Sequence, residues 1–231
     1  MSKNYLIVGG GSGIGKVISD KLSEAGNHVW ALSRNIEEAN LSNNVKAFKY
    51  DVLEDDELPE LPEELHGLIY CPGSINLKPF ERISLDAFRE ELEINYIGAV
   101  KVIQKAMPRL KKTKGASVLL FSTVAVQNGL PFHTSIAGAK GAIEGLTRSL
   151  AAEYAPKVRV NAVAPSLTDT PMANALLSSD KKREANAERH PLKKVGTPED
   201  IAEMGLFLLS EKADWITGQI FKVDGGMSAL R

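Results

Sequence analysis

Residues 8–15, VGGGSGIG, follow a short apolar run, precede a helical pattern and point most directly to a fold class. Glycine has no side chain, so a backbone at positions 9, 13 and 15 can approach a pyrophosphate group closely. The N–H groups at the start of the following helix can receive phosphate oxygens. Gly-rich turns also occur where nothing is bound, but strand, turn and helix in this order predict a dinucleotide site.

The same alternation of strand and helix continues outward along the chain. Short β-branched runs lie at 5–8, 28–32, 45–50, 67–71, 117–122, 158–163 and 219–223, and helical patterns lie at 14–25, 85–110, 134–154 and 198–209. Alternation of this kind is typical of a parallel sheet covered on both faces. We therefore predict an α/β fold, a Rossmann-like doubly wound parallel sheet of about seven strands with helices on both faces, forming a single domain over residues 1–231.

Two segments depart from the regular pattern. Residues 34–51 are too few for a full crossover, so the helix after the second strand is expected to shrink to a turn or two. Residues 178–194 are rich in charge, and we predict a mobile, solvated flap rather than a binding patch there.

Composition excludes several classes of function. The formal net charge is -1, which gives no electrostatic footprint for nucleic acid or an anionic membrane. Cys71 is the only cysteine, so neither an intrachain disulfide nor a cysteine-based metal site is expected. The first residues lack a signal peptide, and no stretch approaches the roughly 20 apolar residues of a membrane span. These features predict a soluble, cytoplasmic protein without a metal.

Further motifs accompany the glycine turn. They are Asp51-Val52, Asn95 in INYIGA, Ser122-Thr123, Lys140, VRVNAVAPSLTDTPM at 158–172 and VDGGM at 223–227. In this order and spacing, the chain resembles the short-chain dehydrogenase/reductase family over essentially its whole length. The resemblance implies binding of NAD(H) or NADP(H), oxidoreduction of a carbonyl/alcohol pair, and a homodimer or homotetramer packed through the long helices.

The resemblance also implies roles for individual residues toward the cofactor. It places Asp51 and Val52 at the adenine, Lys140 at the ribose and the loop 165–170 over the nicotinamide amide. Ser166 stands where the family has glycine, and Cys71-Pro72-Gly73 replaces an Asn-Ala-Gly turn. The full cofactor set is Gly9, Gly11, Ser12, Gly13, Ile14, Gly15, Ser33, Arg34, Asp51, Val52, Cys71, Pro72, Gly73, Lys140, Pro165, Ser166, Thr168 and Thr170.

The choice between the two cofactors depends on the residues after the second strand. An acid there would bind the ribose diol and repel a 2′-phosphate, but the sequence reads WALSRN. Ser33 and Arg34 offer a hydroxyl and a guanidinium to that phosphate. NADP(H) is therefore favoured, with NAD(H) possible.

The chemical step is where the resemblance is incomplete. Ile136, four residues before Lys140, occupies the position of the family's catalytic tyrosine, and losing a general acid typically costs about a hundred- to ten-thousand-fold in rate. Asn95, Thr123 and Lys140 match the other catalytic positions, and Ser122 neighbours Thr123. Water or His133 is a candidate for the missing proton donor, because histidine as a residue type can exchange protons near neutral pH.

Two functions stay open. The first is an NADP(H)-dependent oxidoreductase with a degenerate active site; the second is a catalytically impaired nucleotide-binding protein that senses cofactor or supports a partner. A small-molecule substrate would be enclosed by 74–80, 124–133 and the flap after Pro171. Phe80, Leu130, Phe132 and Met172 in these segments suggest a partly apolar ligand.

Overall fold

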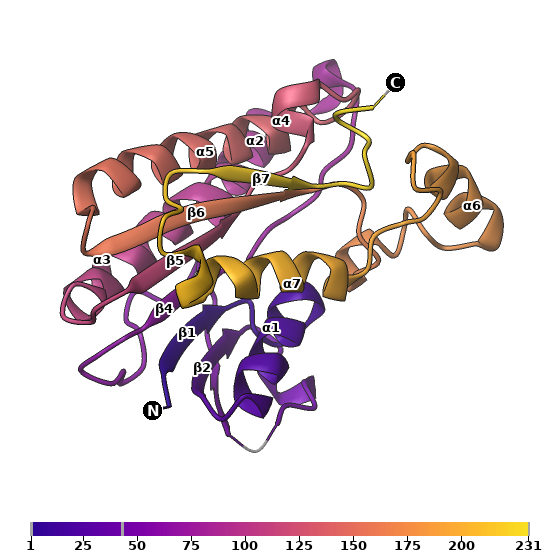
Figure 1. The fold of residues 1–231 in the computed structure, drawn as a ribbon. Coiled ribbons are helices and arrows are strands. Elements are labelled where there is room, and N and C mark those ends of the chain that lie inside the picture. The colour runs from indigo at the N-terminus through magenta and orange to yellow at the C-terminus, as the bar shows by residue number, and fades with distance from the viewer. Residues whose placement is uncertain (1, 43, 231) are drawn as a thin grey trace.

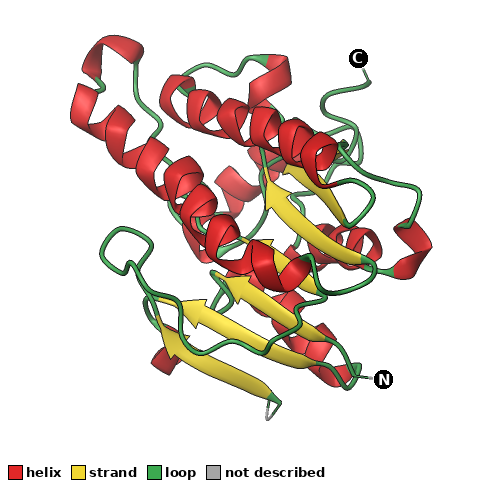
Figure 2. Ribbon diagram, turned by 90° about the vertical axis from the view of Figure 1, so that its left-hand side faces the viewer, coloured by secondary structure: helices red, strands yellow, loops and turns green. Residues whose placement is uncertain are grey.

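The computed structural model describes residues 2–42 and 44–230, and its seven strands form one parallel sheet. The strand order is β3-β2-β1-β4-β5-β6-β7, and the arrows point the same way in Figure 2. The strands are β1 Asn4–Val8, β2 His28–Ser33, β3 Val45–Lys49, β4 Gly67–Tyr70, β5 Ala116–Phe121, β6 Val158–Pro165 and β7 Ile220–Val223. All seven predicted strands are confirmed, with ends that differ by one or two residues.

Helices cover both faces of this sheet, as the doubly wound prediction requires (Figure 1). The longer helices are α1 Gly13–Glu24, α2 Leu85–Leu92, α3 Gly98–Leu110, α5 Thr134–Tyr154, α6 Asp180–Glu188 and α7 Pro198–Leu209. The short ones are Ile36–Glu38, Phe80–Arg82, α4 Ala125–Asn128, Pro171–Ala173 and Glu211–Ala213. Helices α1 and α7 pack on one face, and α3 and α5 pack on the other.

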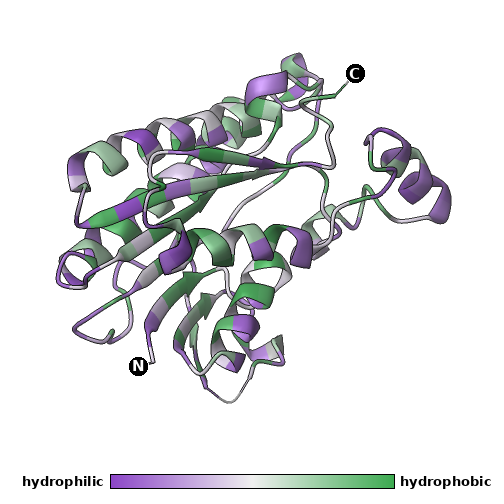
Figure 3. Cartoon of the chain, in the orientation of Figure 1, coloured by the Kyte–Doolittle hydropathy of each residue, from purple (hydrophilic) through white to green (hydrophobic). Residues whose placement is uncertain are grey.

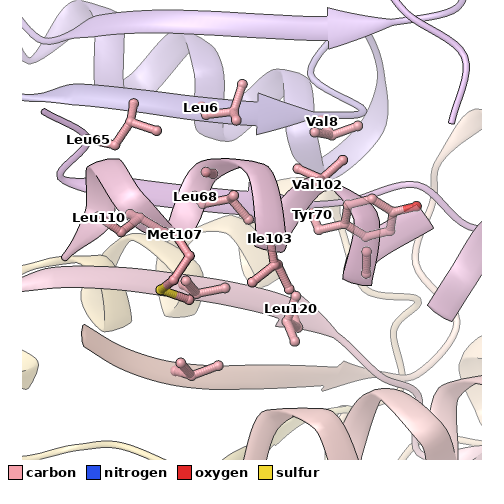
Figure 4. Close-up of a cluster of buried hydrophobic side chains, with 14 of the residues drawn as sticks. Leu6, Val8, Leu65, Leu68, Tyr70, Val102, Ile103, Met107, Leu110 and Leu120 are labelled. Atoms are coloured by element: carbon pink, nitrogen blue, oxygen red, sulfur yellow. The ribbon is translucent and has the colours of Figure 1, made fainter. Parts of the chain in front are cut away.

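Buried aliphatic side chains hold helix α3 against the sheet. Leu6 and Leu68 project from β1 and β4 onto Ile103 and Leu110 of α3, and all four are buried (Figure 4). Burying an aliphatic side chain of this size stabilises the fold by roughly 1.5–3 kcal/mol. Strands with both faces buried read as continuous apolar runs, which is why they could be located in the sequence.

The predicted helix over 85–110 is interrupted. A π-helical turn, Glu93–Ile97, separates α2 from α3. The hydroxyl of Tyr70 donates a hydrogen bond to the Ile94 carbonyl at 2.5 Å. A Cβ at Gly98 would lie only 2.4 Å from the same hydroxyl, so this glycine makes room for the ring. The widened turn holds Asn95 in its middle, and π-bulges of this kind are common at functional sites.

Two segments, 34–51 and 178–194, depart from the regular pattern of the sequence. The connection after β2 is reduced to the turn Ile36–Glu38, as predicted. The stretch 178–194 is solvated and hydrophilic along α6 (Figure 3), but it is built around a helix capped by Ser179, whose hydroxyl accepts from the Lys182 amide. Asn186, Arg189 and His190 near its end line a cavity, so this part of the stretch can contribute to a site, and its mobility stays a prediction.

The topology fixes where a ligand can bind. Strand order reverses between β1 and β4, and crevices at the carboxyl ends of such strands are the usual ligand sites of doubly wound sheets. Among the residues that the structure describes, every helix is too short or too polar to cross a bilayer.

Candidate active site

The glycine turn between β1 and α1 has the geometry that phosphate binding requires. Gly9 and Gly13 have positive φ angles of 80° and 52°, which side chains disfavour. A Cβ at Gly15 would lie 2.2 Å from the Gly9 carbonyl oxygen, so α1 can approach β1 only with glycine there. Ser12 caps α1 in an extended conformation, and its hydroxyl makes no capping bond. The hydroxyl and the first N–H groups of α1 can therefore receive a phosphate.

A cavity of about 420 Å³ opens at this turn and continues across the carboxyl ends of the strands. It brings together nearly all of the residues proposed from the sequence. Those in its wall are Gly9, Ser12, Gly13, Ile14, Gly15, Ser33, Arg34, Asp51, Val52, Cys71, Pro72, Gly73, Ser122, Thr123, Ile136, Lys140, Pro165, Ser166, Thr168 and Thr170. Gly11 packs against Ser33 instead, and Asn95 lies behind the wall.

One end of the cavity is lined by several polar side chains. Ser33 ends β2, and Arg34 follows with an exposed side chain at the rim. Asp51 accepts a hydrogen bond from the Leu53 amide at 2.9 Å, and the apolar side chain of Val52 lies beside it in the wall. A guanidinium, a hydroxyl and an acid therefore share one rim.

The other end contains a buried lysine. Lys140 on α5 is 8% exposed, and burial lowers the pKa of its ammonium to about 8, against opposing effects of Cys71 and Glu91. Burial also raises the pKa of the Cys71 thiol to about 12, so this neighbour is neutral. Ile136 lies one turn before Lys140 in the same wall and is 5% exposed. A lysine whose pKa is near neutrality can itself exchange a proton.

The two hydroxyls at the end of β5 face different surroundings. Ser122 donates to the buried carboxylate of Glu144 at 2.9 Å, a bond that ties β5 to α5. Thr123 accepts from the Ala125 amide at 3.3 Å and is half-buried in the cavity wall. Thr123 is therefore the hydroxyl of this pair that remains able to donate to a ligand.

Asn95 is fully buried and connects α2 to the loop after β4. Its Nδ2 donates to the Ser74 hydroxyl at 3.0 Å and to the Glu91 carbonyl at 2.9 Å. Its Oδ1 has no partner among the described residues. That oxygen and the Lys140 Nζ lie 3.3 and 3.7 Å from a Cβ built at Gly73, so amide and ammonium approach the same glycine.

The loop after β6 is tied to the flap by side chains. Ser166 Oγ lies 2.9 Å from His190 Nε2 and 3.1 Å from the sulfur of Met227, and all three line the cavity. Asp169 pairs with Arg183 of α6, and this contact lowers the pKa of the carboxyl. The loop expected over the nicotinamide is therefore fixed to the flap at two points.

Several residues in or near the site were not found from the sequence. Glu91 lies on α2 with a buried carboxyl, and Asn186, Arg189 and His190 reach the cavity from the flap. The four-residue spacing from Glu91 to Asn95 was a usable signal. The flap residues gave none, because nothing in a charged stretch shows which of its ends folds back.

Of the four apolar residues predicted for the substrate pocket, two line the cavity. Leu130 and Met172 line the cavity. Phe80 is 67% exposed and packs edge-on against Phe88, and Phe132 is 55% exposed. His133 lines the cavity at the start of α5, and its Nδ1 lies 2.7 Å from the Pro131 carbonyl. Because that carbonyl can only accept, Nδ1 carries the proton.

Known proteins are similar to this chain in sequence. Residues 9–228 match a family described as enoyl-(acyl carrier protein) reductase. The 2-(S)-hydroxypropyl-CoM dehydrogenase 3 of Xanthobacter autotrophicus is 34% identical over 97% of this chain and 96% of its own. Inactive 2-(S)-hydroxypropyl-CoM dehydrogenase 2 of the same organism is 35% identical over 72% of this chain and 74% of its own.

A solved structure extends the likeness to three dimensions. A short-chain type dehydrogenase/reductase from Mycobacterium ulcerans superimposes with a TM-score of 0.89 and is 30% identical, covering 100% of this chain and 92% of that one. The glycine turn, the parallel sheet and these relatives all indicate the same family. The chain belongs to the short-chain dehydrogenase/reductase family of oxidoreductases.

Proposed function

We propose that this protein is an NADP(H)-dependent oxidoreductase acting on a carbonyl/alcohol pair, with Lys140 as the proton donor in place of a tyrosine. One observation carries the proposal: a single cavity connects the phosphate-binding turn at α1 to a buried lysine whose pKa is about 8. A lysine that only binds the cofactor does not require a pKa so close to neutral pH.

The residues present fit a dinucleotide, and they favour the phosphorylated form. Gly9, Gly13, Gly15 and Ser12 would hold the pyrophosphate at the start of α1. Arg34 and Ser33 would hold a 2′-phosphate, because a guanidinium forms short, charge-assisted hydrogen bonds to phosphate oxygens.

When bound, NADPH would supply a hydride to the carbonyl carbon of a substrate. Lys140 gives a proton to the oxygen, which becomes an alcohol, and the neutral amine is protonated again from solvent. Thr123 would donate a hydrogen bond to the same oxygen and orient it, while Ile136 forms an apolar part of the wall one helical turn from the lysine. His133 at the cavity wall is the alternative route for the proton.

The substrate we propose is small and partly apolar. Leu130, Met172 and Leu176 give the outer cavity an apolar lining, and Asn186 and Arg189 add polar groups from the flap. A ketone or diketone with an apolar substituent fits such a wall.

A second candidate function is a nucleotide-binding protein without turnover of its own. Ile136 favours it, because an aliphatic side chain cannot exchange a proton, and so does the relative named as inactive. In either case we propose a homodimer or homotetramer, which light scattering of the purified protein would detect.

The two candidates are separated by measuring binding and turnover on the same sample. Calorimetry with NADPH measures binding, and loss of NADPH absorbance over a panel of ketones and diketones measures turnover. We expect both signals. Binding with no turnover on any member of the panel would reject the oxidoreductase and favour the second candidate.

A further inference from the structure

A guanidinium from the flap lies at the outer part of the cavity. Arg189 caps the end of α6, and Arg189 and Asn186 both line the cavity. Arg189 Nη1 donates a hydrogen bond to Asn186 Oδ1 at 3.3 Å. The amide of Asn186 is fixed in turn, because its Nδ2 donates to the carbonyls of Leu176 at 3.2 Å and Lys182 at 2.9 Å. Asn186 therefore holds one edge of the guanidinium at the cavity wall.

This guanidinium has no anionic partner in the part of the chain that the structure describes. Arg189 forms none of the ion pairs found there. The adjacent acid, Glu188, is paired with Lys193 at 3.0 Å. Among the described residues, Asn186 Oδ1 is also the only acceptor that the guanidinium has. The rest of its fork of N–H donors can therefore bind a ligand.

The cavity wall supplies no negative charge close to the flap. Among the described residues that line the cavity, Asp51 is the only acid. Asp51 follows β3 and the flap follows β6, and these strands are five steps apart in the order β3-β2-β1-β4-β5-β6. At roughly 4.8 Å a step, about 24 Å separates them, which exceeds the screening length of about 8 Å at physiological ionic strength. Asp51 therefore does not compensate the charge of Arg189.

Other groups are placed for the phosphates of the cofactor. The pyrophosphate turn at the start of α1 and the rim at Arg34 follow β1 and β2. Arg189 shares its side of the cavity with the apolar Leu176, and the flap is joined there to the loop after β6. An apolar wall with one uncompensated cation is the complement of an apolar chain that ends in an anionic group.

We propose that the substrate is a ketone that bears an anionic group, of which a carboxylate is the simplest, and that Arg189 is the specificity-determining residue that binds this group. A guanidinium can hold a carboxylate through two parallel hydrogen bonds, which fixes its orientation as well as its charge. The inference rests on the proposed function, since it names the substrate class of the same site.

The test compares keto acids with their uncharged methyl esters. The probes are 2-oxo-, 3-oxo- and 4-oxopentanoate and the methyl ester of each, titrated by calorimetry into cofactor-free protein and into protein saturated with NADP⁺. NADP⁺ has no hydride to give, so these titrations measure binding without turnover. In the wild type, at least one acid should bind at least about tenfold more tightly than its ester, as a charge-assisted hydrogen bond allows. Arg189→Gln should remove this preference and leave the affinity of the ester unchanged.

Two further variants separate the guanidinium from other effects. Lys181→Gln removes an exposed cation of α6 that does not line the cavity, so the preference for the acid should persist. Arg189→Lys keeps the charge but not the planar fork, so part of the preference should remain.

Three results would overturn the proposal. They are equal affinity for acids and esters in the wild type, absence of binding by every acid, and a preference that survives in Arg189→Gln. A loss of NADP⁺ affinity in Arg189→Gln would overturn it too, because the guanidinium would then serve the cofactor. Failure of the proposed oxidoreductase would appear separately, as binding of the acid without consumption of NADPH.

Discussion

The hydroxyl of Ser166 and the Nε2 of His190 lie 2.9 Å apart, and this contact joins the loop after β6 to the segment after α6. His190 Nδ1 lies 2.9 Å from the Asn186 carbonyl, which can only accept, so that nitrogen carries the proton. The second ring nitrogen, Nε2, is the one that faces the Ser166 hydroxyl. The Ser166 side chain thus fastens the flap to the cavity.

Ser166→Gly should loosen this connection. Losing one neutral hydrogen bond costs about 1 kcal/mol of binding free energy. KM for a ketone substrate should therefore rise about fivefold while kcat changes little. Steady-state kinetics would show it, and proteolysis within 178–194 should become faster. Ser178→Gly is the control, because that hydroxyl bonds only to the Ala175 carbonyl and to Lys182, neither of which lines the cavity. Equal KM values in the two variants would mean that the contact does not hold the flap.

The fold could be predicted further than the site. Fully buried strands and a glycine turn leave local signals, so the sheet and both of its helical layers were predictable. The π-turn at Asn95 was not, because it depends on the contact of Tyr70 with Ile94, 24 residues away. Glu91 was missed for a related reason: burial of a charged residue on an otherwise exposed helix is decided by what packs against it.

Arg34→Ala should weaken NADPH binding and leave NADH binding unchanged. A hydrogen bond to a charged group contributes about 1.5–3 kcal/mol, which corresponds to at least about tenfold in Kd. Calorimetry with both cofactors measures the effect. Lys112→Ala removes an exposed cation beyond the end of α3 and should change neither affinity. Wild-type protein that binds both cofactors equally would reject the NADP(H) preference.

Ile136→Tyr should restore the proton donor that the family resemblance leads one to expect. If Thr123 and Lys140 are arranged for reaction, turnover of an activated diketone should rise at least about tenfold, a small part of what a positioned acid contributes. Ile136→Phe fills similar space without a hydroxyl and should give no gain. Overpacking costs roughly 1–3 kcal/mol, so circular dichroism must show that both variants fold. A folded tyrosine variant no faster than the phenylalanine variant would mean that a side chain at position 136 does not reach the reacting oxygen.

Lys140→Met should make the protein more stable and less active. The folded pKa of about 8 lies below the model value of 10.5, so the unfolded chain binds more protons between these values. The buried ammonium therefore destabilises the wild-type fold by on the order of 3 kcal/mol below pH 8. This destabilisation disappears as pH rises toward 10.5. Urea unfolding should show a more stable variant at pH 7 and a smaller difference at pH 9.5. A variant less stable than the wild type at pH 7 would contradict a strained, buried ammonium.

The most direct test of Lys140 as proton donor is the pH dependence of NADPH consumption by the wild-type protein with an activated diketone at saturating cofactor. The ammonium must be present for the oxygen to receive its proton, so the rate should be constant at lower pH and fall as pH rises through about 8. Lys140→Met, at concentrations where NADPH is bound, should show no such dependence and a rate near background. A wild-type protein that binds NADPH but consumes it no faster than this variant at any pH would contradict the role of Lys140 as proton donor.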